Sequence, residues 1–304
     1  MRLRAGDVAV ITGAGSGIGR AAALALAKKG CDVVLADLDD QAAARVAELA
    51  AGRYGVRAAS IGCDVRSDAD VGRLFGTVVR DFGGVDVAVL NAGIGYYARV
   101  EETPADDLAR LFEVNVLGVQ RCVVAATPLV RAQGRGALAI TGSVNGKVAW
   151  PYHGAYSATK FALAGLAQGL RMELGGSGVS CTLVLPANVR TGFYAAAQTD
   201  GYNAAPIGPS TSAAQVARSI VRGIERGAAE VYAVPAGLGA GARLGLVFPG
   251  IAESMARRWM KGRRDGGIRW GAIETAPRAA SGIKRPIADA DASLPGHAMS
   301  NDRG

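Results

Sequence analysis

A short apolar run, a glycine-rich loop and a helical segment open this chain, and together they restrict its fold more than any other feature. The run at 8–11 has the composition of a buried strand, and residues 21–29 have that of a helix. Between them lie Gly13, Gly17 and Gly19. Glycines allow a tight turn and a close main-chain approach, and a helix N-terminus attracts phosphate. The unit favours a nucleotide-binding α/β domain, although a purely structural turn is the alternative.

The spacing of these glycines departs from the strict dinucleotide pattern G-x-G-x-x-G. Ile18 stands where that pattern, started at Gly13, needs its last glycine. The loop is instead Thr12-Gly-x-x-x-Gly-x-Gly. The strand before it and the helix after it are therefore needed to support a nucleotide site.

Strand-like and helix-like segments alternate as far as residue 235. The strands are expected at 32–36, 57–61, 86–90, 137–141, 179–185 and 231–234, and the helices at 67–82, 104–130, 156–174 and 210–226. Such alternation predicts a doubly wound, Rossmann-like parallel sheet in a single α/β domain, residues 1–235. Residues 192–209 have no clear periodicity, and so long a loop in a compact domain suggests a substrate lid.

An acidic residue ends the second predicted strand. Asp37 lies 18 residues beyond Gly19, where a carboxylate can bind the adenosine ribose of NAD and repel the 2′-phosphate of NADP. Leu38 follows it, at a position where a basic residue would favour the phosphate. The pattern favours NAD. The alternative is that Asp37 only caps the helix beginning near Asp40.

Small or polar residues also follow the third and fourth predicted strands. Asp64 could meet the amino group of an adenine, or it could cap the helix at 67–82. Asn91, Ala92 and Gly93 allow the end of the next strand to lie against a cofactor. These positions extend the predicted nucleotide site along one edge of the sheet.

The segment from Ser143 to Lys160 carries the candidate chemistry. At the start of a helix, Tyr156 and Lys160 are one turn apart on one face, so that an ammonium can lower the pKa of a phenol. Ser143 follows the strand at 137–141 and would point into the ligand crevice. Asn115, among apolar neighbours, is either a satisfied structural group or part of a proton path. Alone, the Tyr-x-x-x-Lys spacing also suits a packed aromatic beside a solvated lysine.

Taken together, these motifs resemble the classical short-chain dehydrogenase/reductase family over roughly residues 7–235. The resemblance implies that Tyr156 transfers the proton, Lys160 lowers its pKa and holds the nicotinamide ribose, Ser143 binds the substrate oxygen and Asn115 supports a water relay. One departure is Ala187, where the family commonly has glycine. The cofactor contacts it implies are Gly13, Ser16, Gly17, Ile18, Gly19, Asp37, Asp64, Val65, Asn91, Ala92, Gly93, Tyr156, Lys160, Pro186, Val189 and Thr191.

The residues expected to border the reacting carbon are mostly apolar or aromatic, which suggests a hydrophobic alcohol or ketone such as a steroid-like, terpenoid or acyl-chain compound. They are Ile94, Tyr96, Asn145, Trp150, His153, Phe193 and Tyr194. The same residues could instead pack on the lid or on a second subunit. The family resemblance implies a homodimer or homotetramer that pairs through the helices at 104–130 and 156–174.

Composition excludes several other classes of protein. The net charge is +8, but the basic surplus is concentrated in 236–270 and no basic stripe is interleaved with aromatics, so nucleic acid is not expected as a partner. The four cysteines are scattered among apolar runs, which suits a reduced cytoplasmic protein. With 2 histidines, a histidine-based metal site is not expected. No signal peptide or membrane-spanning run is predicted.

The end of the chain differs from the rest. Residues 236–270 form a basic C-terminal extension in which 244–264 has amphipathic helical spacing. Such a helix packs on the domain or on another subunit, or it contacts an anionic membrane surface peripherally. Residues 271–304 have the composition of a disordered tail. The leading hypothesis is an NAD-dependent oxidoreductase; the rivals are an NADPH-dependent carbonyl reductase and a catalytically silent nucleotide-binding regulator.

Overall fold

The computed structural model describes residues 1–199, 209–235, 250, 253–254 and 257–258. All of them belong to one compact unit, Met1–Ala272. The predicted tail at 271–304 and most of the predicted extension at 236–270 lie outside the described residues. The described positions within 244–264 are helical, and there Arg257 bonds Glu253 at 3.0 Å. Among the described residues no helix is long and apolar enough to cross a bilayer.

A seven-stranded sheet forms the centre of the unit, in the order β11-β7-β6-β4-β1-β2-β3. Every pairing within it is parallel. The predicted doubly wound, Rossmann-like fold is therefore confirmed. The strands are β1 Val8–Thr12, β2 Asp32–Asp37, β3 Ala58–Gly62, β4 Val87–Leu90, β6 Gly136–Thr141, β7 Val179–Pro186 and β11 Glu230–Ala233.

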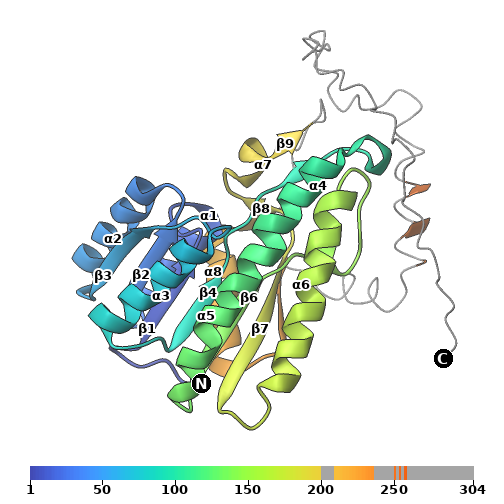
Figure 1. Ribbon diagram of the computed structural model, residues 1–304. Coiled ribbons are helices and arrows are strands. Elements are labelled where there is room, and N and C mark those ends of the chain that lie inside the picture. The colour runs from blue at the N-terminus through green and yellow to red at the C-terminus, as the bar shows by residue number, and fades with distance from the viewer. Residues whose placement is uncertain (200–208, 236–249, 251–252, 255–256, 259–304) are drawn as a thin grey trace, which may run out of the picture. The chain divides into compact units, whose positions relative to one another are not determined.

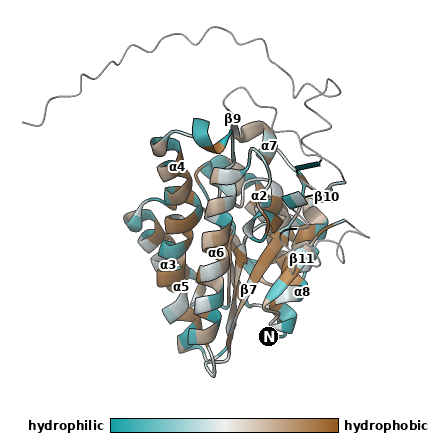
Figure 2. Cartoon of the chain, turned by 90° about the vertical axis from the view of Figure 1, so that its right-hand side faces the viewer, coloured by the Kyte–Doolittle hydropathy of each residue, from teal (hydrophilic) through white to brown (hydrophobic). Residues whose placement is uncertain are grey.

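Helices cover both faces of this sheet. Their bounds are α1 Gly17–Ala27, α2 Asp40–Tyr54, α3 Asp68–Phe82, α5 Gly118–Ala132, α6 Gly154–Glu173 and α8 Ala213–Arg226. Alternate residues of β1 face the two layers: Val8 and Val10 pack with α3, α5 and α6, whereas Ala9 and Ile11 pack with α1, α2 and α8. Figure 2 shows the apolar strand β7 beside helices of mixed hydropathy. Burial on both faces explains the continuous apolar runs of the sequence.

The helical stretch predicted at 104–130 is interrupted. Helix α4 (Ala105–Phe112) passes into a π-helical segment, Glu113–Leu117, and only then into α5. The π segment contains Asn115, which is fully buried. π-helical turns insert an extra residue into a helix and often occur at functional sites. The π segment thus lies where Asn115 is buried in the domain.

Short elements that the sequence did not predict gather around α7 (Phe193–Ala196). Strand β5 (Tyr96–Tyr97) pairs with β9 (Gln198–Thr199), and β8 (Val189–Arg190) pairs with β10 (Thr211–Ser212). The β5–β9 pairing holds residues 198–199 of the predicted lid against β5. Residues 200–208 lie outside the described residues. Figure 1 shows α7 and β9 at the same end of the sheet as α4.

Candidate active site

The glycine loop between β1 and α1 is packed so tightly that Gly13 and Gly19 have no room for a side chain. Gly13 has a φ of +64°, and a Cβ there would lie 2.9 Å from the Ala92 Cα. A Cβ on Gly19 would lie 2.0 Å from the Gly13 carbonyl oxygen. Ser16 precedes α1 without a side-chain cap, and the first turn carries no acidic residue. The first amides of α1 are therefore available to an anion, as a pyrophosphate requires.

Asn91 acts as a clamp for this loop. Its Nδ2 donates to the carbonyl oxygens of Thr12 and Gly13, both at 3.2 Å, and its Oδ1 accepts from the Thr141 hydroxyl at 3.2 Å. The Thr12 hydroxyl in turn accepts from the amides of Asn91 and Ala92. The side chain of Asn91 thus joins the ends of β1, β4 and β6, and any contact it makes with a cofactor is additional to this structural role.

Asp37 reaches back from the end of β2 to the glycine loop. One carboxylate oxygen accepts from the Gly15 amide at 2.8 Å, and the other accepts from the Asp39 amide at 3.0 Å. Asp39, not Asp37, is the N-cap of α2. The alternative reading of Asp37 as a helix cap is therefore wrong, and its charge is fixed beside the loop.

Asp64 and Val65 lie just beyond β3. The Asp64 carboxylate pairs with Arg66 at 2.6 Å, and this hydrogen bond lowers the pKa of the carboxyl. The cap of α3 is Ser67, so the alternative reading of Asp64 as that cap is wrong. Val65 is buried against Gly118 at the start of α5. The predicted adenine contact of Asp64 stays a prediction, and it would have to form beside Arg66.

Tyr156, Lys160 and Ser143 are brought together in the buried interior. Tyr156 is 8% exposed and Lys160 5%. The Lys160 ammonium lies 5.4 Å from the centroid of the Tyr156 ring and donates to the Thr141 carbonyl at 3.1 Å. The Ser143 hydroxyl is hydrogen-bonded to Tyr156 and lies 3.4 Å from the Pro186 carbonyl oxygen. The Tyr-x-x-x-Lys pair on the helix and the serine at the end of the strand therefore lie at one site.

Burial dominates the ionisation of this group. It raises the pKa of Tyr156 well above its ordinary value, the nearby Tyr194 raises it further, and the Ser143 hydrogen bond opposes both. Burial also lowers the pKa of Lys160 to about 8. The expected lowering of the tyrosine pKa by Lys160 does not appear among the influences of the protein's own residues on Tyr156. Burial thus favours the protonated phenol, and the phenolate needs further stabilisation for Tyr156 to act as a base.

Asn115 is held by main-chain and side-chain bonds rather than left open. Its Oδ1 accepts from the Ile94 amide at 2.8 Å, and its Nδ2 donates to the Ile94 carbonyl at 3.0 Å and the Thr159 hydroxyl at 3.2 Å. A Cβ on Gly93 would lie 3.1 Å from that Oδ1. The polar groups of the Asn115 side chain are thus hydrogen-bonded within the protein, as the structural interpretation expects. These bonds link the π segment to Ile94 and to α6. Its proposed part in a water relay is not tested by these bonds.

Aromatic rings surround Tyr156, and one of them is not the residue that the sequence predicted. The centroid of the Tyr97 ring lies 6.4 Å from that of Tyr156 and 6.0 Å from that of Tyr194. The Tyr97 and His153 rings meet edge-on, with their centroids 4.6 Å apart. Phe193 lies 5.9 Å from Tyr156. Tyr96, the predicted neighbour, is instead buried in a separate cluster that includes Ala98 and Leu111. Adjacent residues of β5 point in opposite directions, so Tyr97 replaces Tyr96 in the candidate site.

The other predicted substrate residues lie at varied positions. The Asn145 amide donates to the Ser143 hydroxyl at 3.1 Å. Trp150 is 42% exposed. His153 immediately precedes α6, its Nδ1 bonds the Pro151 carbonyl at 2.9 Å, and burial lowers its pKa. A carbonyl only accepts, so Nδ1 carries a proton and donates it to this bond.

The loop after β7 approaches the glycine loop. Methyl and hydroxyl-bearing carbons of Thr191 lie 3.4 Å from where a Cβ on Gly17 would stand. Ala187, the departure from the family pattern, donates its amide to the Ala233 carbonyl at 3.3 Å and continues the β7–β11 pairing. Val189 is buried in β8. Alanine at 187 is thus accommodated in ordinary backbone geometry, and Thr191 faces the loop as expected.

Comparison with known proteins agrees with this arrangement. The family model described as short chain dehydrogenase matches residues 7–201. The chain belongs to the short-chain dehydrogenase family. A short-chain dehydrogenase/reductase from Armillaria gallica is 40% identical over 191 residues, which cover 62% of this chain and 73% of that protein.

Two solved structures show which cofactors similar proteins hold. A short-chain dehydrogenase/reductase from Burkholderia phymatum in complex with NAD has a TM-score of 0.74 and 33% identity, and the match covers 80% of this chain and 94% of that one. An alcohol dehydrogenase from Thermococcus sibiricus, complexed with 5-hydroxy-NADP, has a TM-score of 0.64 and 30% identity. The match covers 71% of this chain and 89% of that one. The family therefore explains a dinucleotide site without deciding between NAD and NADP. The closely packed glycines of the loop and the uncapped amides of α1 fit such a cofactor.

Proposed function

We propose that this short-chain dehydrogenase interconverts a hydrophobic secondary alcohol and its ketone with NAD. The observation that carries the proposal is the buried Tyr156, hydrogen-bonded to Ser143 and one turn from Lys160, at the end of the sheet that also holds the glycine loop. A catalytically silent regulator would not need these three groups together in its interior. The rival NADPH-dependent reductase differs only at the adenosine end.

The chemistry assigns one task to each side chain. When bound, the nicotinamide supplies or accepts the hydride. Tyr156 Oη takes the hydroxyl proton of an alcohol, or returns it to a carbonyl oxygen in the reverse direction. The Ser143 hydroxyl holds the same substrate oxygen, and it is already held by the Asn145 amide. Lys160 keeps positive charge beside the phenol, which favours the phenolate as it forms.

The preference for NAD rests on Asp37. Two main-chain amides fix its carboxylate beside the glycine loop. A 2′-phosphate placed there would meet a fixed like charge, whereas two ribose hydroxyls would find an acceptor. Leu38, 74% exposed, offers no positive charge in compensation. These contacts support NAD over NADP.

Calorimetric binding of both cofactors tests this preference. We expect wild-type protein to bind NAD at least about tenfold more tightly than NADP, the ratio that roughly 1.4 kcal/mol represents. The double variant Asp37→Ala/Leu38→Arg should reverse the order, because the repulsion is removed and a cation is added. Asp40→Asn, which removes a neighbouring exposed charge, is the matched control and should keep it. Equal affinities in wild type would contradict the proposal.

The substrate proposal rests on the rings over Tyr156. Tyr97, Phe193 and Tyr194 come from β5 and α7, two elements that lie together through the β5–β9 pairing. A Cβ on Gly95 would lie 2.9 Å from the Phe193 ring, so α7 packs directly on the 94–97 segment. Aromatic faces bind apolar groups and prefer flat rings. We therefore propose a hydrophobic substrate with a ring next to the reacting carbon.

A screen of secondary alcohols with NAD, followed by NADH formation, tests both the reaction and this ring preference. Within it, 1-phenylethanol and 1-cyclohexylethanol form a pair matched in size. We expect kcat/KM to favour the aryl member, and Tyr194→Leu to lower that preference by about fivefold, since one aromatic pair contributes roughly 1 kcal/mol. Activity without any aryl preference would remove the ring proposal alone. No turnover of any alcohol or ketone would remove the reaction.

The chain is also proposed to pair with a second copy through α5 and α6, which lie side by side in Figure 1. Both helices carry exposed apolar side chains: Val124, 63% exposed, on α5, and Phe161 and Met172, 46% and 72% exposed, on α6. Exposed apolar surface of this kind marks an interface. Light scattering should give at least a dimeric mass for the full chain. A monomer at micromolar concentration would contradict the pairing.

A further inference from the structure

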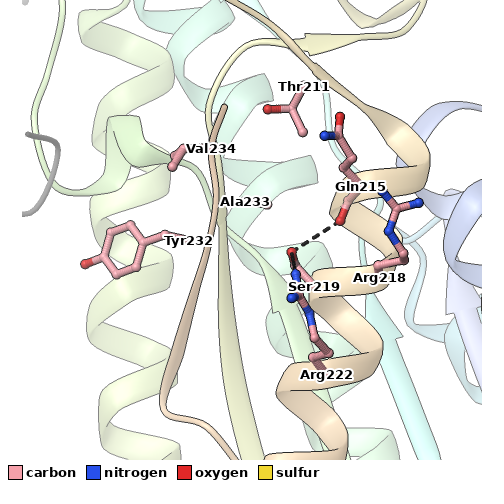
Figure 3. A pocket seen from close by; sticks show the side chains of 8 residues that line it. All are labelled: Thr211, Gln215, Arg218, Ser219, Arg222, Tyr232, Ala233 and Val234. Carbon is pink, nitrogen blue, oxygen red and sulfur yellow. Dashed lines mark hydrogen bonds between the residues drawn. The ribbon is translucent and has the colours of Figure 1, made fainter. Parts of the chain in front are cut away.

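A polar hollow lies between α8 and the edge strand β11, away from Tyr156. It has a volume of about 270 Å³. Figure 3 shows its lining, in which the Tyr232 and Val234 side chains point away from α8, Ser219 and Arg222 lie on the side of α8 that faces the strand, and Arg218 lies on the other side of the helix. The lining residues are Thr211, Gln215, Arg218, Ser219, Arg222, Tyr232, Ala233 and Val234. The polar side chains of the hollow therefore come from α8 and from Thr211 beside it.

Donor groups predominate in these side chains. Gln215 forms a capping box with Ser212, and its amide oxygen accepts from the Ser212 amide at 2.9 Å and hydroxyl at 3.0 Å. The amide nitrogen of Gln215 is the atom that these bonds leave to a ligand. Ser219 donates to the Gln215 carbonyl at 3.2 Å and accepts from Arg222 Nη2 at 3.2 Å. The helix thus presents N–H groups rather than acceptors.

The positive charge in the hollow is not neutralised by neighbours. Within the described part of the chain, neither Arg218 nor Arg222 has a carboxylate within ion-pair distance. The acidic residues nearest in sequence are already engaged, because Glu225 pairs with Lys29 at 2.8 Å and Glu230 pairs with Lys147 at 2.6 Å. The two arginines are one helical turn apart, and both line the hollow. Guanidinium forks match carboxylate and phosphate oxygens.

Thr211 supplies a second, independent observation. It is 2% exposed, and its Oγ1 is buried without a hydrogen-bond partner. Buried hydroxyls are normally bonded, so this atom calls for a partner. The main chain of Thr211 is engaged, since its amide donates to the Asn188 carbonyl at 2.7 Å. A ligand oxygen in the hollow would satisfy the hydroxyl.

We propose that the hollow between α8 and β11 binds a small oxyanion, the phosphate or carboxylate group of a soluble metabolite, through Arg218, Arg222 and the Thr211 hydroxyl. The site is joined to the catalytic end of the sheet. Thr211 holds Asn188 through β10 and β8, and Asn188 Oδ1 accepts from the Tyr194 hydroxyl at 3.1 Å. An oxyanion on Thr211 therefore steadies the loop that carries Tyr194.

Calorimetric titration of the full chain with inorganic phosphate, and separately with malonate, tests the site and tells a phosphate site from a carboxylate site. Sodium chloride at matched ionic strength is the control solute. Arg218→Gln and Arg222→Gln should each weaken binding about tenfold, the loss of one charge-assisted contact. Arg226→Gln, on the same helix but outside the hollow, is the matched variant and should bind as wild type. Thermal unfolding of each variant verifies that it folds.

Two further results decide the proposal. Hydrogen exchange at 187–194 should slow on adding phosphate to wild type and stay unchanged in Arg222→Gln. Equal binding by all variants, or a wild-type response no larger than that to sodium chloride, would overturn the site. A change of oligomeric mass in the Arg218 or Arg222 variants would also overturn it, because a second copy would then occupy the hollow. None of these readouts depends on catalytic activity, so the outcome is separate from that of the proposed reaction.

Discussion

Tyr156→Phe is expected to lower turnover by about 10² to 10⁴-fold, the usual contribution of a positioned acid or base. The ring would keep its place among Tyr97 and Phe193, because the substitution removes only the hydroxyl. What is lost is the proton carrier and its hydrogen bond to Ser143. NAD affinity, measured by calorimetry, should change little. Steady-state kcat with the best alcohol of the screen is the deciding measurement.

Tyr97→Phe is the matched control for this substitution. It removes the hydroxyl of a neighbouring buried tyrosine, 3% exposed, whose ring also meets His153. Turnover in this variant should stay within a few-fold of wild type. Turnover near wild type in Tyr156→Phe would contradict the mechanism, whereas an equal loss in both variants would mean that packing, and not proton transfer, had been measured.

Much of the fold could be predicted because each sheet strand is marked by its own local sequence. The runs at 8–11 and 137–141 are buried on both faces, so they are apolar throughout and easily recognised. The strand-end polar residues followed, since carboxyl ends of parallel strands share one edge. This is how Asp37 and Ser143 could be placed before their bonds were known. The family resemblance then ordered them into one site.

The errors arose where distant pairings decide the outcome. Tyr96 and Tyr97 are equivalent in sequence, and only the pairing of β5 with β9 sets which ring faces Tyr156. The π-helical segment Glu113–Leu117 contains no glycine or proline, so nothing in the sequence at 104–130 marked the interruption of the predicted helix. The pKa of Tyr156 depends on three-dimensional burial, which the spacing of a tyrosine and a lysine does not report. Local sequence patterns therefore predict the helices and strands, whereas contacts between distant segments determine ring orientation and pKa at the site.

Gly19→Ala is expected to disrupt the cofactor site and to destabilise the domain. The new Cβ would lie 2.0 Å from the Gly13 carbonyl oxygen and 2.7 Å from Asn91 Nδ2. Neither atom can retreat freely, because Asn91 clamps Gly13 and is itself bonded to Thr141. Relief must come from moving the loop away from α1. We expect a loss of about 1 to 3 kcal/mol in unfolding free energy and of at least about tenfold in NAD affinity.

Gly72→Ala separates this clash from the general effect of replacing a helical glycine. Gly72 lies exposed within α3, and a Cβ there would have nothing within 4 Å. Alanine should therefore stabilise α3 by up to about 1 kcal/mol and leave NAD binding unchanged. Thermal unfolding and calorimetry of the two variants give opposite signs if the loop is as closely packed as described. Similar melting temperatures and similar affinities would show instead that the loop relaxes around a methyl group, and then close packing at Gly19 could not be what shapes the phosphate cradle.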